Sequence, residues 1–353
     1  MEDLFAPAWA RLERAQELPG VIAEGWNAYI AKHPYMPRVL DHGGGVFILR
    51  VEELVPPPEE IAVAVGEWLY NIRSSLDYVI WAAAAHASGK VPPPREGVLQ
   101  YPVYDQQAEW DRNMHRLKPL AEHQRAMLLH MQPFNSDLDA NYLRWINRLA
   151  RLDRHRHLNR VTGRLVQGNP VLALPEGSRG ALQWGERVIL DGKADLARVS
   201  VTPWRSSSKV QINPRVAVDP EIEAWSDSDF WSRIPLGERF RLCQVFVKGE
   251  IATYEYDCTG RTRSPEILTD DFKRECDERR SGTRSEPRRQ VREVVWGPPL
   301  DGQQSSPEKF PSGDPGADQS RLAHQRLLVV DGSALVSAAP GDLLPSGDDT
   351  EIL

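Results

Sequence analysis

The stretch from Glu59 to Ser88 constrains the fold most strongly, because its residue pattern predicts one long, buried helix. Prolines at 56–58 precede it, and proline favours the first helical turn, where its missing N–H would be unpaired anyway. Glu59 and Glu60 favour the positive end of the helix dipole. Apolar residues then recur with a helical period at Ile61, Val65, Trp68, Leu69, Ile72, Leu76, Val79, Ile80 and Ala83. Gly89 and the prolines at 92–94 end the helix.

This helix carries a polar cluster where apolar residues would be expected. Arg73 and Asp77 are four residues apart and therefore face each other, and Asn71 lies on an adjoining strip. In one interpretation the arginine and the aspartate form an internal ion pair that fixes how neighbouring helices dock, because an unpaired buried charge is costly. In the other, Arg73 points into a cleft and binds a phosphate or carboxylate through its planar guanidinium group. The sequence leaves both interpretations open.

A second informative helix runs from about Asn141 to the region of residues 160–164, and it is rich in arginine. A basic row lies beside its apolar stripe, at steps of four, three and four residues, and consists of Arg144, Arg148, Arg151 and His155. Between residues 144 and 164, seven arginines stand against one acid, Asp153. The row is either an ordinary solvated face or an anion-binding face, since arginines at this density repel one another unless a negative group lies among them. A metal site is not predicted, because His155 and His157 would lie nearly opposite each other on a helix.

The whole chain predicts an α+β fold in three regions. Residues 1–165 are expected to form a helical bundle that includes a short strand or hairpin near residues 46–51. Residues 166–260 are expected to form a small antiparallel sheet packed on the bundle, because apolar and β-branched residues run between turn signals. Residues 261–353 are too polar to bury a core and are expected to be a mostly disordered acidic tail, with 321–330 undecided between helix and strand. Further expected elements are helices at 2–31, 106–116 and 119–131 and late strands at 240–247 and 251–257.

Charge is concentrated in the tail. The 353 residues carry a formal net charge of -7, and residues 294–353 contribute -6 of it through nine acids and three bases. The body is therefore close to neutral. A near-neutral body neither demands nor excludes a polyanionic partner, because the local clustering of charge decides.

Three cysteines without a Cys-x-x-Cys pair predict no disulfide framework and a reducing, cytoplasmic location. The N-terminus lacks a secretory signal, and no apolar run is long enough to span a bilayer, so no membrane association is expected. The chain has no phosphate-binding loop or nucleophile elbow, and no cofactor is predicted.

Three stretches resemble a bacterial family whose activity is uncharacterised. The family shows Gly-x4-Asn-x-Arg-Ser-x-Leu-Asp-His on one helix, then a Gln-Pro-aromatic break, then Leu-x3-Asp-x-His-Arg on a later helix. The matching residues here are Gly66, Asn71, Arg73, Ser74, Leu76, Asp77, Gln132, Pro133, Phe134, Leu149, Asp153, His155 and Arg156. The resemblance covers about residues 1–260, and it identifies a family rather than a reaction.

The first block also resembles the Arg-x4–6-His signature of HEPN helical domains, many of which are metal-independent ribonucleases that work as dimers. The chain departs from that signature at Tyr78, five residues after Arg73, where the histidine is expected. A phenol does not act as a proton acceptor at neutral pH as an imidazole does. The histidine could instead come from the later helix, where Arg148 with His155, and Arg151 with His157, satisfy the spacing.

Two functions follow as expectations. In the first, the protein binds RNA or a nucleotide, forms a homodimer and acts as a metal-independent, HEPN-like ribonuclease. Its residues would be His155 and Arg73 for catalysis, Arg148 and Arg151 for binding phosphate, and Asn71, Asp77 and Asp153 for orienting these groups. In the second, the protein is a non-enzymatic structural or interaction protein, and its Arg, Asp and His cluster is a buried polar lock between two helices.

Overall fold

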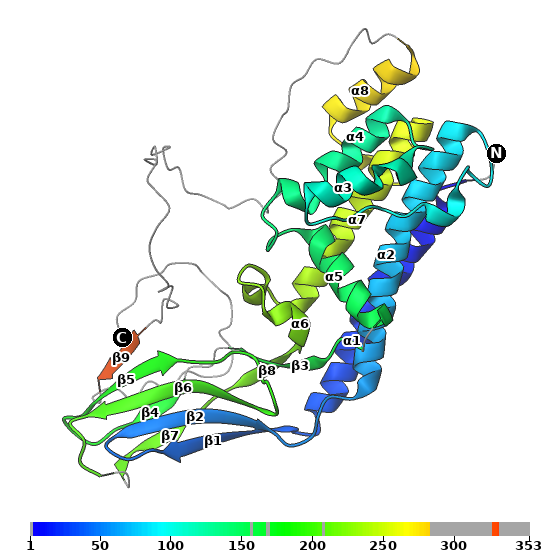
Figure 1. Cartoon of the computed structure of the whole chain (residues 1–353). Coiled ribbons are helices and arrows are strands. Elements are labelled where there is room, and N and C mark those ends of the chain that lie inside the picture. The colour runs from blue at the N-terminus through cyan, green and yellow to red at the C-terminus, as the bar shows by residue number, and fades with distance from the viewer. Residues whose placement is uncertain (1–2, 156–157, 167–169, 207–208, 283–326, 332–353) are drawn as a thin grey trace, which may run out of the picture.

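The computed structural model describes residues 3–155, 158–166, 170–206, 209–282 and 327–331. Helices and antiparallel sheets form an α+β fold in this part of the chain, as predicted. Figure 1 shows a body of helices at one end and the sheets at the other, with β3 (Val161–Val166) and β8 (Ala217–Ile222) where the two parts meet. None of the described helices is long and apolar enough to cross a membrane.

The helical body is organised around the predicted central helix. Its long helices are α1 (Ala6–Ile30), α2 (Glu59–Ser88), α5 (Tyr142–His155) and α7 (Leu236–Thr259). α2 packs against each of the other three, and one apolar core joins them. The predicted end of α2 is confirmed, because Gly89 adopts the left-handed conformation (φ 62°) that lets the chain leave the helix. α1 continues as a single helix through Pro19.

α7 corrects the expectation of two strands at residues 240–247 and 251–257, which was wrong. The region is one helix of 24 residues, with Phe240, Cys243, Val247 and Ile251 buried at helical spacing. Buried polar residues interrupt that apolar stripe, namely Arg239, Gln244, Glu250, Glu255 and Asp257. Because the stripe is broken, the aromatic and β-branched residues of this region give a sequence pattern typical of two short strands. In the structure, packing against α1 and α2 favours the helix over this local preference.

The smaller helices lie mainly at the end of the body away from the sheets (Figure 1). They are α3 (Gln107–Asn113), α4 (Glu122–His130) and α8 (Asp270–Arg280), with α6 (Glu223–Ser226) near the sheets and short 3-10 turns at Glu96–Val98, Met114–Leu117, Pro133–Asn135, Trp231–Arg233 and Pro265–Ile267. α3 and α4 confirm the helices predicted at 106–116 and 119–131.

α8 corrects the expected start of the disordered tail at residue 261. The side chain of Thr269 accepts a hydrogen bond from the main-chain N–H of Phe272, which caps the helix. Acids in its first turn and arginines in its last turn complement the helix dipole. These terminal features favour a helix in a segment with few apolar residues. The expected disorder of residues 283–326 and 332–353 concerns positions outside the described residues.

Beside the helical body, the described residues form three antiparallel sheets. The strands besides β3 and β8 are β1 (Tyr35–Asp41), β2 (Val46–Glu53), β4 (Val171–Ala173), β5 (Arg179–Trp184), β6 (Lys193–Thr202), β7 (Gln211–Asn213) and β9 (Leu327–Asp331). One five-stranded sheet has the order β1-β2-β6-β5-β9, and β3 pairs with β8 and β4 with β7. β9 therefore gives residues 327–331 a strand conformation, which the sequence left undecided.

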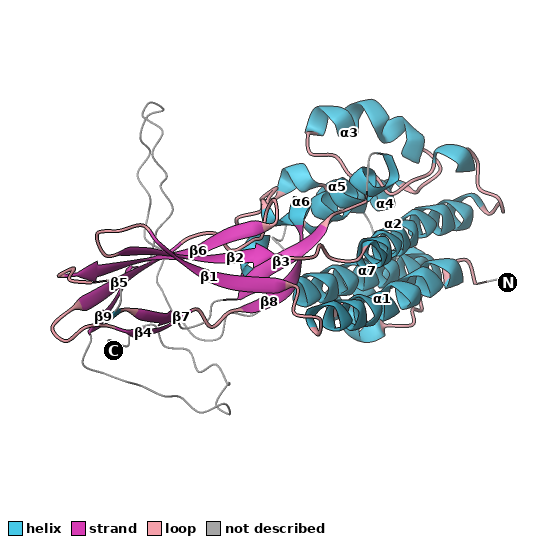
Figure 2. Cartoon of the chain, turned by 90° about the horizontal axis from the view of Figure 1, so that it is seen from below, coloured by secondary structure: helices cyan, strands magenta, loops and turns pink. Residues whose placement is uncertain are grey.

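The inner face of the five-stranded sheet covers its own apolar core. Phe47, Leu49 and Val51 of β2 point inward, with Leu182 of β5 and Val199 of β6 beside them. Side chains from the two smaller sheets pack against this core. Figure 2 shows β4 and β7 to one side of the larger sheet, so the opposite, outer face of that sheet remains uncovered by them.

A buried ion pair joins the sheets to the helical body. Arg239 of α7 donates through Nη1 and Nη2 to the two carboxylate oxygens of Glu221 of β8, at 2.7 and 2.6 Å. Both side chains are essentially inaccessible to water. Arg239 also donates to the main-chain oxygen of Ile234, and its guanidinium carbon lies 5.3 Å from the ring centre of Trp225. This bidentate pair fixes where β8 meets α7.

Candidate functional site

Arg73 and Asp77 form the predicted pair on α2, and the pair holds another segment of the chain. Nη1 of Arg73 donates to Oδ1 of Asp77 at 2.6 Å, and Nη2 donates to the main-chain oxygen of Tyr101 at 2.5 Å. Oδ1 of Asp77 also accepts the main-chain N–H of Tyr101 at 2.8 Å. Arg73 is only 6% exposed. The pair thus binds both main-chain polar groups of Tyr101.

Gln132 binds the following residues of the same extended segment. Its Nε2 donates to the main-chain oxygen of Pro102 at 3.0 Å, and its Oε1 accepts the main-chain N–H of Tyr104 at 3.1 Å. Gln132 is buried. Buried main-chain groups need hydrogen-bond partners, and residues 101–104 belong to no strand. Arg73, Asp77 and Gln132 therefore supply the hydrogen bonds that a neighbouring strand would supply to this segment.

Glu250 of α7 completes this cluster, and sequence reasoning missed it because its surroundings were interpreted as strands. The hydroxyl of Tyr101 donates to Oε2 of Glu250 at 2.6 Å. Burial raises the pKa of Glu250 to about 7, although the hydrogen bond from Tyr101 opposes that shift. Helical spacing from Cys243 and Val247 was the available signal for its inward position.

Burial and mutual attraction shift the pKa values of Arg73 and Asp77 in opposite directions. Burial lowers the pKa of Arg73 and raises the pKa of Asp77, because it disfavours the charged form of each group. Their mutual attraction opposes both shifts. The chemical consequence is a guanidinium group whose terminal nitrogens already donate to protein oxygens.

Asn71 and Asp153, predicted to orient the site, point elsewhere. Oδ1 of Asn71 accepts a hydrogen bond from Nη1 of Arg11 of α1 at 3.2 Å. The carboxylate of Asp153 lies against Gly66 of α2, where an added Cβ would be 2.8 Å from both carboxylate oxygens. Oδ1 of Asp153 is buried without a hydrogen-bond partner among the described residues. Among the described residues, neither Asn71 nor Asp153 forms a hydrogen bond with Arg73.

The three arginines of the predicted basic row lie on the outer face of α5. The buried face of the helix consists of Leu143, Trp145, Ile146, Leu149 and Ala150. Arg148, Arg151 and Arg154 are exposed, and Arg144 is half-buried. The structure therefore separates Arg73, inside the body, from Arg148 and Arg151 on its surface.

The arginines of this row differ in their partners. Nε of Arg144 donates to Oδ2 of Asp105 at 3.2 Å. The guanidinium group of Arg148 lies 3.6 Å from the carboxylate of Asp227 and 4.7 Å from the ring centre of Trp145. In the described part of the chain, Arg151 has neither a hydrogen bond nor an ion pair. The positive charge of the row is thus only partly compensated.

The two histidines expected at the site, His155 and His157, have side chains outside the described part of the structure. His155 is the last residue of α5, and the placement of its side chain lies outside what the structure describes, as do residues 156–157. Tyr78, at the position where the HEPN signature has histidine, is 36% exposed. Within the described ranges, no group of three or more His, Cys, Asp or Glu side chains could hold a metal ion.

Comparison of the chain with protein-family models, with curated protein sequences and with solved structures finds no significant match.

Proposed function

We propose that the protein binds a phosphate-rich polyanion, RNA or a nucleotide, on the outer face of α5, and that Arg73 and Asp77 serve the fold. The observation that carries this proposal is a set of three exposed α5 arginines, Arg148, Arg151 and Arg154, of which Arg151 has no partner among the described residues. Beside the larger effect of burial, the charge of Arg154 also acts on the buried pair of Arg73 and Asp77 and lowers the pKa of both groups. Exposed arginines bind phosphate through planar, multiple N–H donors.

The packing of Arg148 supports a binding role. Its stacking on Trp145, at 4.7 Å, limits the freedom of the guanidinium group. A restricted donor loses less conformational entropy when it meets a ligand.

Binding is favoured over RNA cleavage by the surroundings of Arg73. Its two terminal nitrogens donate to Asp77 and to the main chain of Tyr101, so a phosphate would have to displace buried partners. Tyr78 replaces the histidine of the HEPN signature. The ribonuclease alternative then depends on a histidine of the later helix, His155 or His157.

Binding of a labelled single-stranded RNA of about 20 nucleotides tests the proposal. Three phosphate contacts predict a slope of about -2 in a plot of log affinity against log salt, so affinity should fall roughly 15-fold between about 50 and about 200 mM salt. The combined variant Arg148→Gln, Arg151→Gln and Arg154→Gln should lose at least about tenfold in affinity and most of the salt dependence.

The matched control removes three exposed arginines from other helices. Arg14, Arg241 and Arg274 are each paired with an acid three residues away, and their replacement by glutamine changes the net charge equally. Equal losses in the two combined variants, or no binding by the wild type at low salt, would reject the α5 site. RNA should remain intact without metal; cleavage that disappears in His155→Ala would favour the ribonuclease instead.

A further inference from the structure

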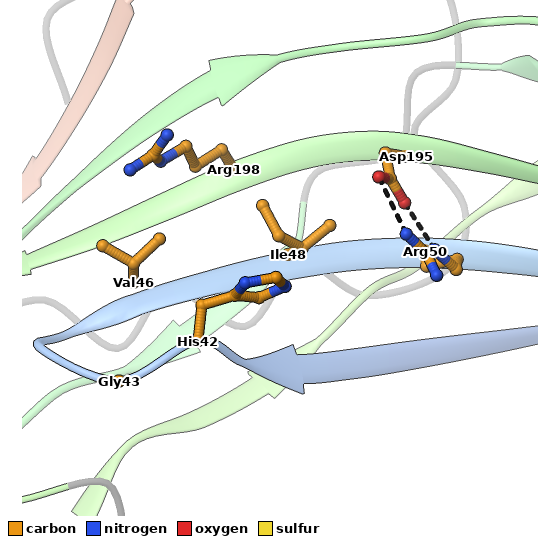
Figure 3. Close-up of a pocket in the computed structure, with 7 residues that line it drawn as sticks. All are labelled: His42, Gly43, Val46, Ile48, Arg50, Asp195 and Arg198. Atoms are coloured by element: carbon orange, nitrogen blue, oxygen red, sulfur yellow. Dashed lines mark hydrogen bonds and ion pairs between the residues drawn. The ribbon is translucent and has the colours of Figure 1, made fainter.

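The outer face of the five-stranded sheet contains a hollow of about 340 Å³ beside the turn between β1 and β2. Figure 3 shows Ile48 between Arg198 of β6 and the paired side chains of Arg50 and Asp195, with His42 at the margin. The volume is within the range of small-molecule sites. This hollow lies in the sheets and is therefore separate from the α5 face.

The charged groups of the hollow leave one cation available. Nε and Nη2 of Arg50 donate to the two carboxylate oxygens of Asp195 at 2.6 and 3.0 Å, so these charges largely compensate each other. Hydrogen bonds from Arg50 lower the pKa of Asp195, which keeps its carboxylate ionised. Arg198 is exposed and, among the described residues, forms no hydrogen bond or ion pair. An anionic group fits this uncompensated guanidinium.

The floor of the hollow is apolar. Val46 and Ile48 are consecutive outward-facing residues of β2, and Ile48 is directly opposite Arg198 in the β2–β6 register. Both are half-buried and belong to neither apolar core. A short hydrocarbon group would cover them while an attached anion contacts Arg198.

The wall formed by the β1–β2 turn is held in place. The main-chain N–H of Val201 in β6 donates to the main-chain oxygen of Gly45 at 2.8 Å. Gly45 has φ +85°, and a Cβ there would lie 2.7 Å from the main-chain oxygen of Val201. Only glycine permits this approach. The turn is thus fixed against β6 before any ligand arrives, which reduces the entropy cost of binding.

We propose that this hollow binds a small amphiphilic anion, a short hydrocarbon group that ends in a carboxylate or a comparable oxyanion. Arg198 contacts the anion, and Val46 and Ile48 contact the hydrocarbon. The bidentate pair of Arg50 and Asp195 forms the opposite wall.

Titration of the full-length protein with hexanoate, followed by NMR, tests this site. Hexanoate should bind with saturation, and both hexan-1-ol and inorganic phosphate should bind at least about tenfold more weakly, because each lacks one of the two recognised parts. Arg198→Gln should weaken hexanoate binding at least about tenfold, since a charge-assisted contact is lost.

Arg179→Gln is the matched control. Arg179 is exposed on the same outer face of the sheet, at the β5 position paired with Thr202, and does not line the hollow. Its replacement should change hexanoate affinity less than about twofold. Absence of saturation, equal binding of phosphate, or equal effects of the two variants would overturn the proposal. Arg198→Gln should retain RNA binding, so failure here is distinguishable from failure of the α5 site.

Discussion

At the residue scale, burial changes the acid–base chemistry of Glu250. It lies inside the helical body with the Tyr101 hydroxyl as its hydrogen-bond donor. A carboxyl with a pKa of about 7 is protonated much more readily than an exposed glutamate. The folded protein therefore binds this proton more tightly than the unfolded chain does, and its stability depends on pH.

Glu250→Gln should stabilise the protein above neutral pH. The pKa in the folded state is raised, so the contribution of Glu250 to stability is fully present below the pKa of the unfolded chain and is lost as pH rises to about 7. Because a tenfold change in proton affinity corresponds to about 1.4 kcal/mol, the variant gains on the order of 3 kcal/mol at most near pH 8. Glutamine still offers an oxygen to Tyr101. Chemical denaturation at about pH 5 and about pH 8 measures the difference; an equal effect at both values would contradict it.

At the element scale, α2 acts as a support for an irregular segment as well as a core helix. Arg73 and Asp77 hold Tyr101, and Gln132 holds Pro102 and Tyr104. The sequence predicted the limits of α2 and the contact between Arg73 and Asp77, because helical spacing is local information. It could not predict the segment that they hold, because that contact depends on how distant parts of the chain meet.

α7 was not predicted as a helix, because its buried polar residues depend on contacts with distant parts of the chain. Its inward positions include Gln244, Glu250 and Glu255, each of which has a hydrogen-bond partner in a distant part of the chain. Without those partners a buried polar residue is costly, so a pattern of this kind does not indicate a buried helical face. The outer row of α5 was predictable, because its apolar and charged faces are separated in the sequence.

Arg73→Ala should lower the free energy of unfolding by about 3 kcal/mol or more, because it leaves the Asp77 carboxylate without its charged partner and the Tyr101 carbonyl without its donor. Arg241→Ala is the control, since Arg241 and Glu238 form an exposed pair and should contribute less than about 1 kcal/mol. Denaturant unfolding of the two variants gives the comparison. Unchanged or increased stability of Arg73→Ala would indicate that the arginine is held ready for a ligand instead.

At the scale of the whole molecule, the helical body and the sheets are joined by contacts between distant parts of the sequence. β2 precedes α2 in the chain but pairs with β6, and Arg239 of α7 pairs with Glu221 of β8. The sequence-based boundary at residue 165 therefore marks a change of local pattern. The helical body includes α7 from beyond that boundary, and the large sheet includes β1 and β2 from before it.

The Arg239–Glu221 pair predicts strong energetic coupling across this junction. Arg239→Ala should cost several kcal/mol, roughly 3–5, because it leaves a buried carboxylate without its main donor. The combined variant Arg239→Met and Glu221→Leu should cost less than the sum of the two single changes. Arg164, whose guanidinium group lies 3.8 Å from Glu221, would still lose a neighbour. A double-mutant cycle by denaturant unfolding measures the coupling, and additive effects would exclude it.

β9, the strand that pairs with β5 at the edge of the large sheet, is synthesised long after β5. β5 ends at Trp184, whereas its neighbour β9 begins at Leu327. A ribosome needs on the order of ten seconds to make the chain between them. During that interval one edge of β5 has unpaired N–H and C=O groups, and such an edge can pair with a strand of another molecule. Nascent copies translated side by side on one mRNA can therefore pair with each other along the free edge of β5.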